Sequence, residues 1–99
     1  MTIQVIRNPN KVEFIKHEIQ RFYGRQILSS RDCIILSEEI FYKTGEKLNP
    51  NTLRRFFGLV KADYPPSRAT LDILAKYCGF NNFEQVHDQN IERPHAKNN

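Results

Sequence analysis

Two arginines and an asparagine stand close together in the segment Asn49–Val60, whose sequence is NPNTLRRFFGLV. A guanidinium carries N–H donors that match a phosphate or the edge of guanine, and a carboxamide matches the edge of adenine. At about 100° per residue in a helix, Asn51, Arg54 and Arg55 share one side. These residue types at this spacing favour contact with a nucleic acid, although a solvated helix surface often carries the same side chains.

The surrounding residues predict the helix that would present this side, and we expect it to run from Pro50 to Val60. The side chain of Asn49 can accept a hydrogen bond from a free backbone N–H at the helix start. Pro50 suits the first helical position, where a missing N–H costs nothing. The opposite side of this helix is apolar and is expected to be buried; it comprises Leu53, Phe56, Phe57 and Val60.

Upstream, the sequence predicts a first helix at about Lys11–Arg25. Asn10 and Glu13 have the spacing of a capping box, and apolar residues then recur at helical intervals. A weak alternation of apolar and polar residues over Met1–Arg7 predicts a short extended arm before this helix.

A second helix is expected to begin at Ser29 or Ser30 and to end at Gly45. Either serine can cap the helix, and Asp32 in the first turn interacts favourably with the helix dipole. Glycine adopts the left-handed conformation in which many helices end. The residues Glu46–Leu48 then form a short connection to the next helix.

Two further helices are predicted towards the C-terminus. The paired prolines in Lys61–Pro66 interrupt the helical pattern, and Ser67 then caps a fourth helix that closes at Gly79 and an apolar residue. Asn81 and Glu84 repeat the capping-box spacing and predict a short fifth helix.

These elements predict an all-α fold, a compact five-helix bundle with short links. The helical domain is expected over residues 1–88. Residues 89–99 have no apolar period, so we expect a flexible polar tail or a linker there.

The second and third predicted helices have the layout of a helix-turn-helix, in which a helix ends at a glycine and a short turn leads to a helix with exposed polar groups. Leu48–Gly58, LNPNTLRRFFG, resembles the recognition segment of phage-repressor-type and lactose-repressor-type transcriptional regulators. The matching positions are Leu48, Asn49, Thr52, Leu53 and Arg55. Pro66–Phe80, PSRATLDILAKYCGF, resembles the fourth helix of phage-repressor-type domains.

The resemblance implies a DNA-binding regulator of transcription that reads duplex DNA with the helix Pro50–Val60. Asn51 and Thr52, in its first turn, would contact bases or phosphates. Arg54 and Arg55 would contact a guanine or clamp phosphates. Further phosphate contacts are implied at the turn and at the start of the fourth helix, by Lys43, Lys47, Ser67 and Arg68. An ordinary helix cap is the simpler interpretation of Ser67.

The composition agrees with a polyanionic partner such as double-stranded DNA. The 99 residues include 15 Lys or Arg and 11 Asp or Glu, which gives a formal net charge of +4 and a sequence pI of about 9.3. This length suits one domain with one modest core, which the seven Phe and four Tyr help to fill.

Signatures of catalysis are missing from the sequence. It has no glycine-rich phosphate loop, no histidine pair at metal spacing and no nucleophile motif, so we expect no enzyme, no cofactor and no metal site. Cys33 and Cys78 lie in helical patterns and are expected in the core. No segment approaches the roughly 18 apolar residues that cross a bilayer, and we expect a cytoplasmic protein.

The alternative function is a protein–protein interaction module on a repressor-like scaffold, because a fold does not dictate a function. Such a module would use an exposed aromatic patch formed by Phe14, Phe41, Tyr42 and Tyr64. DNA binding instead requires one shared surface for the five cations Lys43, Lys47, Arg54, Arg55 and Arg68. With either function, the sequence leaves open whether the chain forms a homodimer and whether it is attached to further domains.

Overall fold

The computed structural model describes residues 3–86, with side chains from Lys11 onward. It contains four α-helices and one 3-10 turn: α1 (Ile3–Tyr23), α2 (Ser30–Thr44), α3 (Pro50–Phe56), α4 (Arg68–Tyr77) and η1 (Phe83–Gln85). Within this described range there is no strand, so the all-α prediction is confirmed, while the prediction of five helices is wrong. The predicted tail at residues 89–99 lies outside the described residues.

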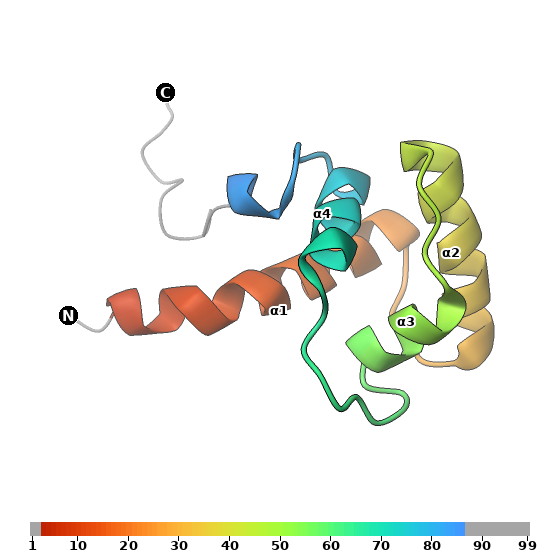
Figure 1. Ribbon diagram of the computed structural model, residues 1–99, viewed down its shortest axis with the longest axis horizontal. Coiled ribbons are helices and arrows are strands. Elements are labelled where there is room, and N and C mark those ends of the chain that lie inside the picture. Colours follow the sequence, from red (N-terminus) through yellow and green to blue (C-terminus); the bar gives the residue numbers. More distant parts are fainter. Residues whose placement is uncertain (1–2, 87–99) are drawn as a thin grey trace.

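Figure 1 shows how the helices are arranged. α1 runs along the long axis, α4 lies beside its C-terminal half, and α2 and α3 stand together at one end. The chain between α3 and α4 loops out before it returns to α4. None of the helices in the described part is both long and apolar enough to span a bilayer.

The first helix begins earlier than the sequence predicted, and the expected extended arm is wrong for the described residues 3–7. α1 starts at Ile3 and continues through Pro9, which costs one backbone hydrogen bond but does not forbid a helix. The spacing of Asn10 and Glu13 misled the prediction, because two residues three apart also neighbour each other inside a helix. Glu13 accepts a hydrogen bond from Lys16 one turn further on.

The predicted fifth helix is only the 3-10 turn η1. Its cap is Asn82, whose side chain accepts from the Gln85 N–H, one residue later than the predicted Asn81 cap. The Phe83 N–H donates to Asp72 of α4 over 2.9 Å, which ties the turn to that helix. Three residues are too few for α-helical hydrogen bonds, so this segment forms a 3-10 turn, whose hydrogen bonds join residues three apart.

The helix α2 begins and ends at the residues that the sequence predicted. Ser29 is the N-cap and forms a capping box with Asp32, and Gly45 ends the helix at φ 81°. Ser67 caps α4 as predicted, and Gly79 follows its end with φ 99°. The same local rules therefore fix both ends of these two helices.

The helix α3 is shorter than predicted, because it ends at Phe56 rather than Val60. Gly58 adopts φ 77°, and the N–H groups of Gly58 and Leu59 donate to the carbonyls of Arg55 and Arg54. This is a Schellman motif, which turns the chain out of the helix and brings Leu59 against the core. The predicted burial of Val60 is wrong, since it is 41% exposed.

The core lies where all four helices meet. It draws buried apolar residues from every helix and from the connections, namely Ile15, Ile19, Ile27, Cys33, Leu36, Ile40, Leu48, Leu53, Phe56, Leu74, Ala75, Tyr77, Cys78 and Val86. Both cysteines are free and buried, so their predicted core placement is confirmed, and burial raises the pKa of the Cys78 thiol to about 12. The phenol of Tyr77 donates to Glu39 over 2.7 Å and joins α4 to α2.

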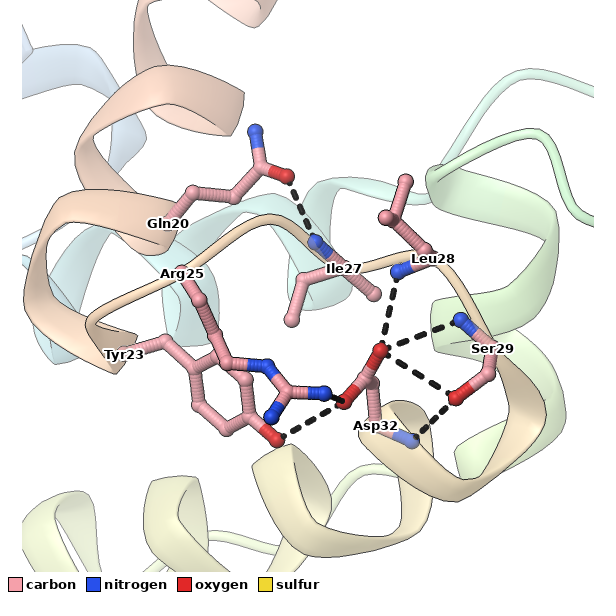
Figure 2. A network of polar contacts seen from close by, with 7 residues as sticks. All are labelled: Gln20, Tyr23, Arg25, Ile27, Leu28, Ser29 and Asp32. Atoms are coloured by element: carbon pink, nitrogen blue, oxygen red, sulfur yellow. Dashed lines mark hydrogen bonds and ion pairs between the residues drawn. The ribbon is translucent and has the colours of Figure 1, made fainter.

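The corner between α1 and α2 is organised by one buried carboxylate, Asp32 (Figure 2). One of its oxygens accepts from the N–H groups of Leu28 and Ser29 and from the Ser29 hydroxyl. The other accepts from Arg25 over 2.8 Å and from the Tyr23 phenol over 3.3 Å. The side chain of Asp32 is only 3% exposed, and five donors replace the water that it loses on folding.

These donors shift the titration of Asp32. The Leu28 N–H, with the Ser29 hydroxyl and the Arg25 guanidinium, holds the pKa of Asp32 below its ordinary value of 3.8, against the opposing effect of burial. The folded protein therefore favours the ionised form. The corresponding stabilisation is fully present above pH 3.8 and is lost as the pH falls through the lower pKa of the folded state.

The first prediction concerns this carboxylate. Replacing Asp32 by Asn should lower the urea midpoint at neutral pH, because an amide cannot accept from all five donors. It should also flatten the decline in stability below pH 3.8. Urea titrations across an acidic pH series measure both effects. Asp63→Asn, which makes the same substitution at an exposed aspartate of the loop before α4, is the matched control; equal pH profiles for the two variants would contradict the assignment.

The second prediction separates the two adjacent phenylalanines of α3. Phe56 is 6% exposed, so Phe56→Ala should cost roughly 3–5 kcal/mol of unfolding free energy. Phe57 is only partly buried, so Phe57→Ala should cost clearly less. Denaturant unfolding with a common m-value measures the difference. A larger loss from Phe57→Ala would show that the buried side of α3 is wrongly assigned.

Candidate nucleic-acid interface

The helix α3 is fixed at its start by its own first residues. The Asn49 side chain accepts from the Asn51 N–H over 2.7 Å, and Pro50 occupies the first helical position. Leu53 and Phe56 anchor the helix in the core. Local capping and two buried side chains therefore hold this short helix with its polar side outward.

Arg54 spans the gap between α3 and the start of α2. Its Nη1 donates to Asn51 Oδ1 over 2.8 Å, and its Nε donates to the Ser30 hydroxyl over 3.0 Å. Both acceptors are neutral, so the guanidinium keeps its full charge while its orientation is restricted. A guanidinium held in this way loses less side-chain freedom when it meets a phosphate or a base.

Arg55 and Thr52 face a different part of the surface, an open groove of about 570 Å³ between α1, α3 and the loop that leads to α4. The groove is lined by Val12, Lys16, Thr52, Arg55, Phe56, Ala62, Asp63, Tyr64, Pro65, Pro66, Ser67 and Thr70. Arg55 is exposed, and Lys16 places its ammonium 5.5 Å from the centre of the Phe56 ring. Two cations, several hydroxyls and the carboxylate of Asp63 thus line the groove beside α3.

No carboxylate lies within ion-pair distance of Arg54 or Arg55 in the part of the chain that the structure describes. Neither arginine is therefore held in an ion pair by the described residues, although the carboxylate of Asp63 lines the groove that Arg55 faces. This distinguishes them from Arg25 and Arg68, whose guanidiniums are bound by carboxylates.

The excess positive charge of the chain falls on residues 47–62, which we call the basic segment. It holds four of the 15 cationic residues, Lys47, Arg54, Arg55 and Lys61, and none of the 11 acidic ones. The rest of the chain carries 11 of each sign and is formally neutral. Lys47, Arg55 and Lys61 are exposed, so the segment presents this charge to solvent.

The structure does not gather all five predicted cations, so the single surface that the sequence analysis required for DNA binding is not formed by all of them. Arg54 contacts Ser30, the first residue of α2, whereas Lys43 lies near the other end of that helix, about 20 Å away at 1.5 Å per residue. There the Lys43 ammonium stands 4.2 Å from the centre of the Phe22 ring. Lys43 therefore lies apart from Arg54, although it precedes Lys47 by only four residues.

The residues predicted at the start of α4 are also engaged within the protein. Arg68 lies 3.6 Å from both Asp72 and Glu84, and Ser67 accepts from the Thr70 N–H as the helix cap. Ser67 nevertheless lines the groove beside Arg55. Sequence reasoning missed two neighbours of the site, Ser30 and Lys16, because only the packing of α3 on α2 and α1 brings them there.

Comparison with family models, curated proteins and solved structures gave no significant match. The functional proposal therefore rests on the residues and geometry described above.

Proposed function

We propose that the protein binds double-stranded DNA, as a transcriptional regulator, through the basic segment. The observation that carries the proposal is the coincidence of three features at and around α3: four cations in a segment without acidic residues, two arginines that form no ion pair among the described residues, and an Asn51–Arg54 pair aligned by a hydrogen bond. DNA carries a phosphate on each strand at every base pair, so uncancelled cations supply most of the non-specific affinity.

The side chains at α3 also offer the means to discriminate sequences. An arginine donates two parallel hydrogen bonds to guanine, and an asparagine pairs with adenine, in the major groove. In a helix-turn-helix arrangement the residues at the start of the second helix reach the base edges, and here that start holds Asn51 and Thr52. We assign base contacts to Asn51 and Arg54, and phosphate contacts to Lys47, Arg55 and Lys61.

The third prediction tests this assignment. The full chain should bind a labelled duplex with a dissociation constant that rises steeply with salt. Arg55→Ala should reduce the salt slope by about one, because a phosphate contact releases about one counterion. Arg54→Ala should cost about 1–3 kcal/mol, with a size that depends on the sequence. Fluorescence anisotropy at several salt concentrations, with single duplexes and a randomised pool, measures both.

Arg21→Ala is the matched control, since Arg21 is a 70% exposed arginine on α1, far along the sequence from the basic segment. It should leave the salt slope and the affinity unchanged. Binding that is absent for every duplex, or that Arg21→Ala weakens as much as Arg55→Ala, would contradict the proposal.

The second candidate function is protein interaction, and exposed aromatic residues favour it. Tyr42 is 92% exposed and Phe41 52% exposed on α2. Phe14, in contrast, packs edge-to-face on Phe80, and Tyr64 lies in the groove beside α3. The four predicted aromatic residues therefore do not form one patch, but the two on α2 belong to a larger apolar surface.

A further inference from the structure

The outer side of α2 carries four large apolar or aromatic side chains although it faces away from the core. Its exposed members recur at three- and four-residue intervals: Arg31, Ile34, Ile35, Glu38, Phe41 and Tyr42, which we call the α2 stripe. Ile34 is 44% exposed, Ile35 40% and Phe41 52%. Exposed apolar residues are common singly, but several on one side of a helix are typical of an interaction surface.

The two charged members of the α2 stripe stand on either side of the isoleucines. Arg31 and Glu38 are seven residues apart, about 10 Å along the helix, so they are two turns from each other. Neither has an ion-pair partner among the described residues. The stripe thus offers one positive and one negative group, equally spaced about the point between Ile34 and Ile35.

We propose that the α2 stripe is the interface with a second copy of this chain, with the two α2 helices antiparallel. A two-fold axis through the point between Ile34 and Ile35 makes the surface self-complementary. It places Arg31 opposite Glu38 of the second copy, and this ion pair occurs twice. The four isoleucines, two from each chain, then meet around the axis.

The ends of the α2 stripe fit the same register. Phe41 of one copy then lies near the N-terminal end of α2 of the other, which Leu28 precedes, and Leu28 is 69% exposed. The Leu28 N–H is held by Asp32, and its side chain points away from that carboxylate (Figure 2). Two otherwise solvated apolar side chains thereby meet at each end of the interface.

A parallel pairing does not fit this charge pattern. It sets Arg31 against Arg31 and Glu38 against Glu38 of the second copy, and like charges at close range oppose association. The antiparallel pairing turns the same four groups into two attractive pairs. The charge pattern therefore fixes the direction, while the isoleucines and aromatic residues supply the apolar area.

The basic segment takes no part in this interface, so the two proposals can fail separately. Self-association is measured by sedimentation velocity of the full chain without DNA, over a range of protein concentrations. We expect a reversible monomer–dimer equilibrium. Ile34→Asp should raise the dimer dissociation constant by at least about tenfold, because it removes apolar contact and places two carboxylates at the axis.

A charge exchange tests the register. Arg31→Glu alone and Glu38→Arg alone should each weaken the dimer by roughly threefold to tenfold, because each creates two repulsive pairs. The double variant Arg31→Glu/Glu38→Arg should restore the dissociation constant of the original chain. Arg21→Glu, an equal charge change on α1, is the control and should leave it unchanged.

Circular dichroism and the melting temperature check that each variant is folded, which we expect because the substituted side chains are exposed. A chain that stays monomeric at all concentrations would overturn the proposal. So would a dimer that survives Ile34→Asp, or a double exchange that fails to recover the affinity lost in both single variants.

Discussion

The fold depends on the buried carboxylate of Asp32. Its five donors come from the end of α1, from the connecting residues and from the cap of α2, so this one group sets the angle at which the chain enters α2. The start of α2 also carries Ser30, the hydroxyl on which Arg54 rests. Protonation of Asp32, or loss of its donors, would destabilise the start of α2. It would thereby weaken the contact between Ser30 and Arg54 of α3.

The sequence predicted the elements whose ends are set by local chemistry. Ser29, Asn49 and Ser67 act as caps because a short polar side chain can reach the free N–H groups beside it. The end of α3 was predicted at Val60, four residues too late, because Gly58 adopts the left-handed turn that follows the helix. The start of α1 was misplaced because a capping-box spacing also occurs inside helices.

The candidate site was predictable only in part. Asn51, Arg54 and Arg55 could be found because they belong to one turn of one helix. Their partners could not, because Ser30 and Lys16 come from other helices and approach α3 only through packing of the core. Packing also explains why Lys43, in the last turn of α2, lies against the rings of Phe22 and Tyr77. Contacts between residues that are distant in the sequence leave no local signal from which they could be predicted.

The central claim is that the basic segment is the surface that meets DNA. Amide chemical-shift mapping by NMR, during titration of the full chain with a short duplex at low salt, tests it most directly. We expect the largest shifts on residues 47–62 and on Ser30. Shifts confined to the outer side of α2, or a spectrum that does not change on addition of duplex, would contradict it.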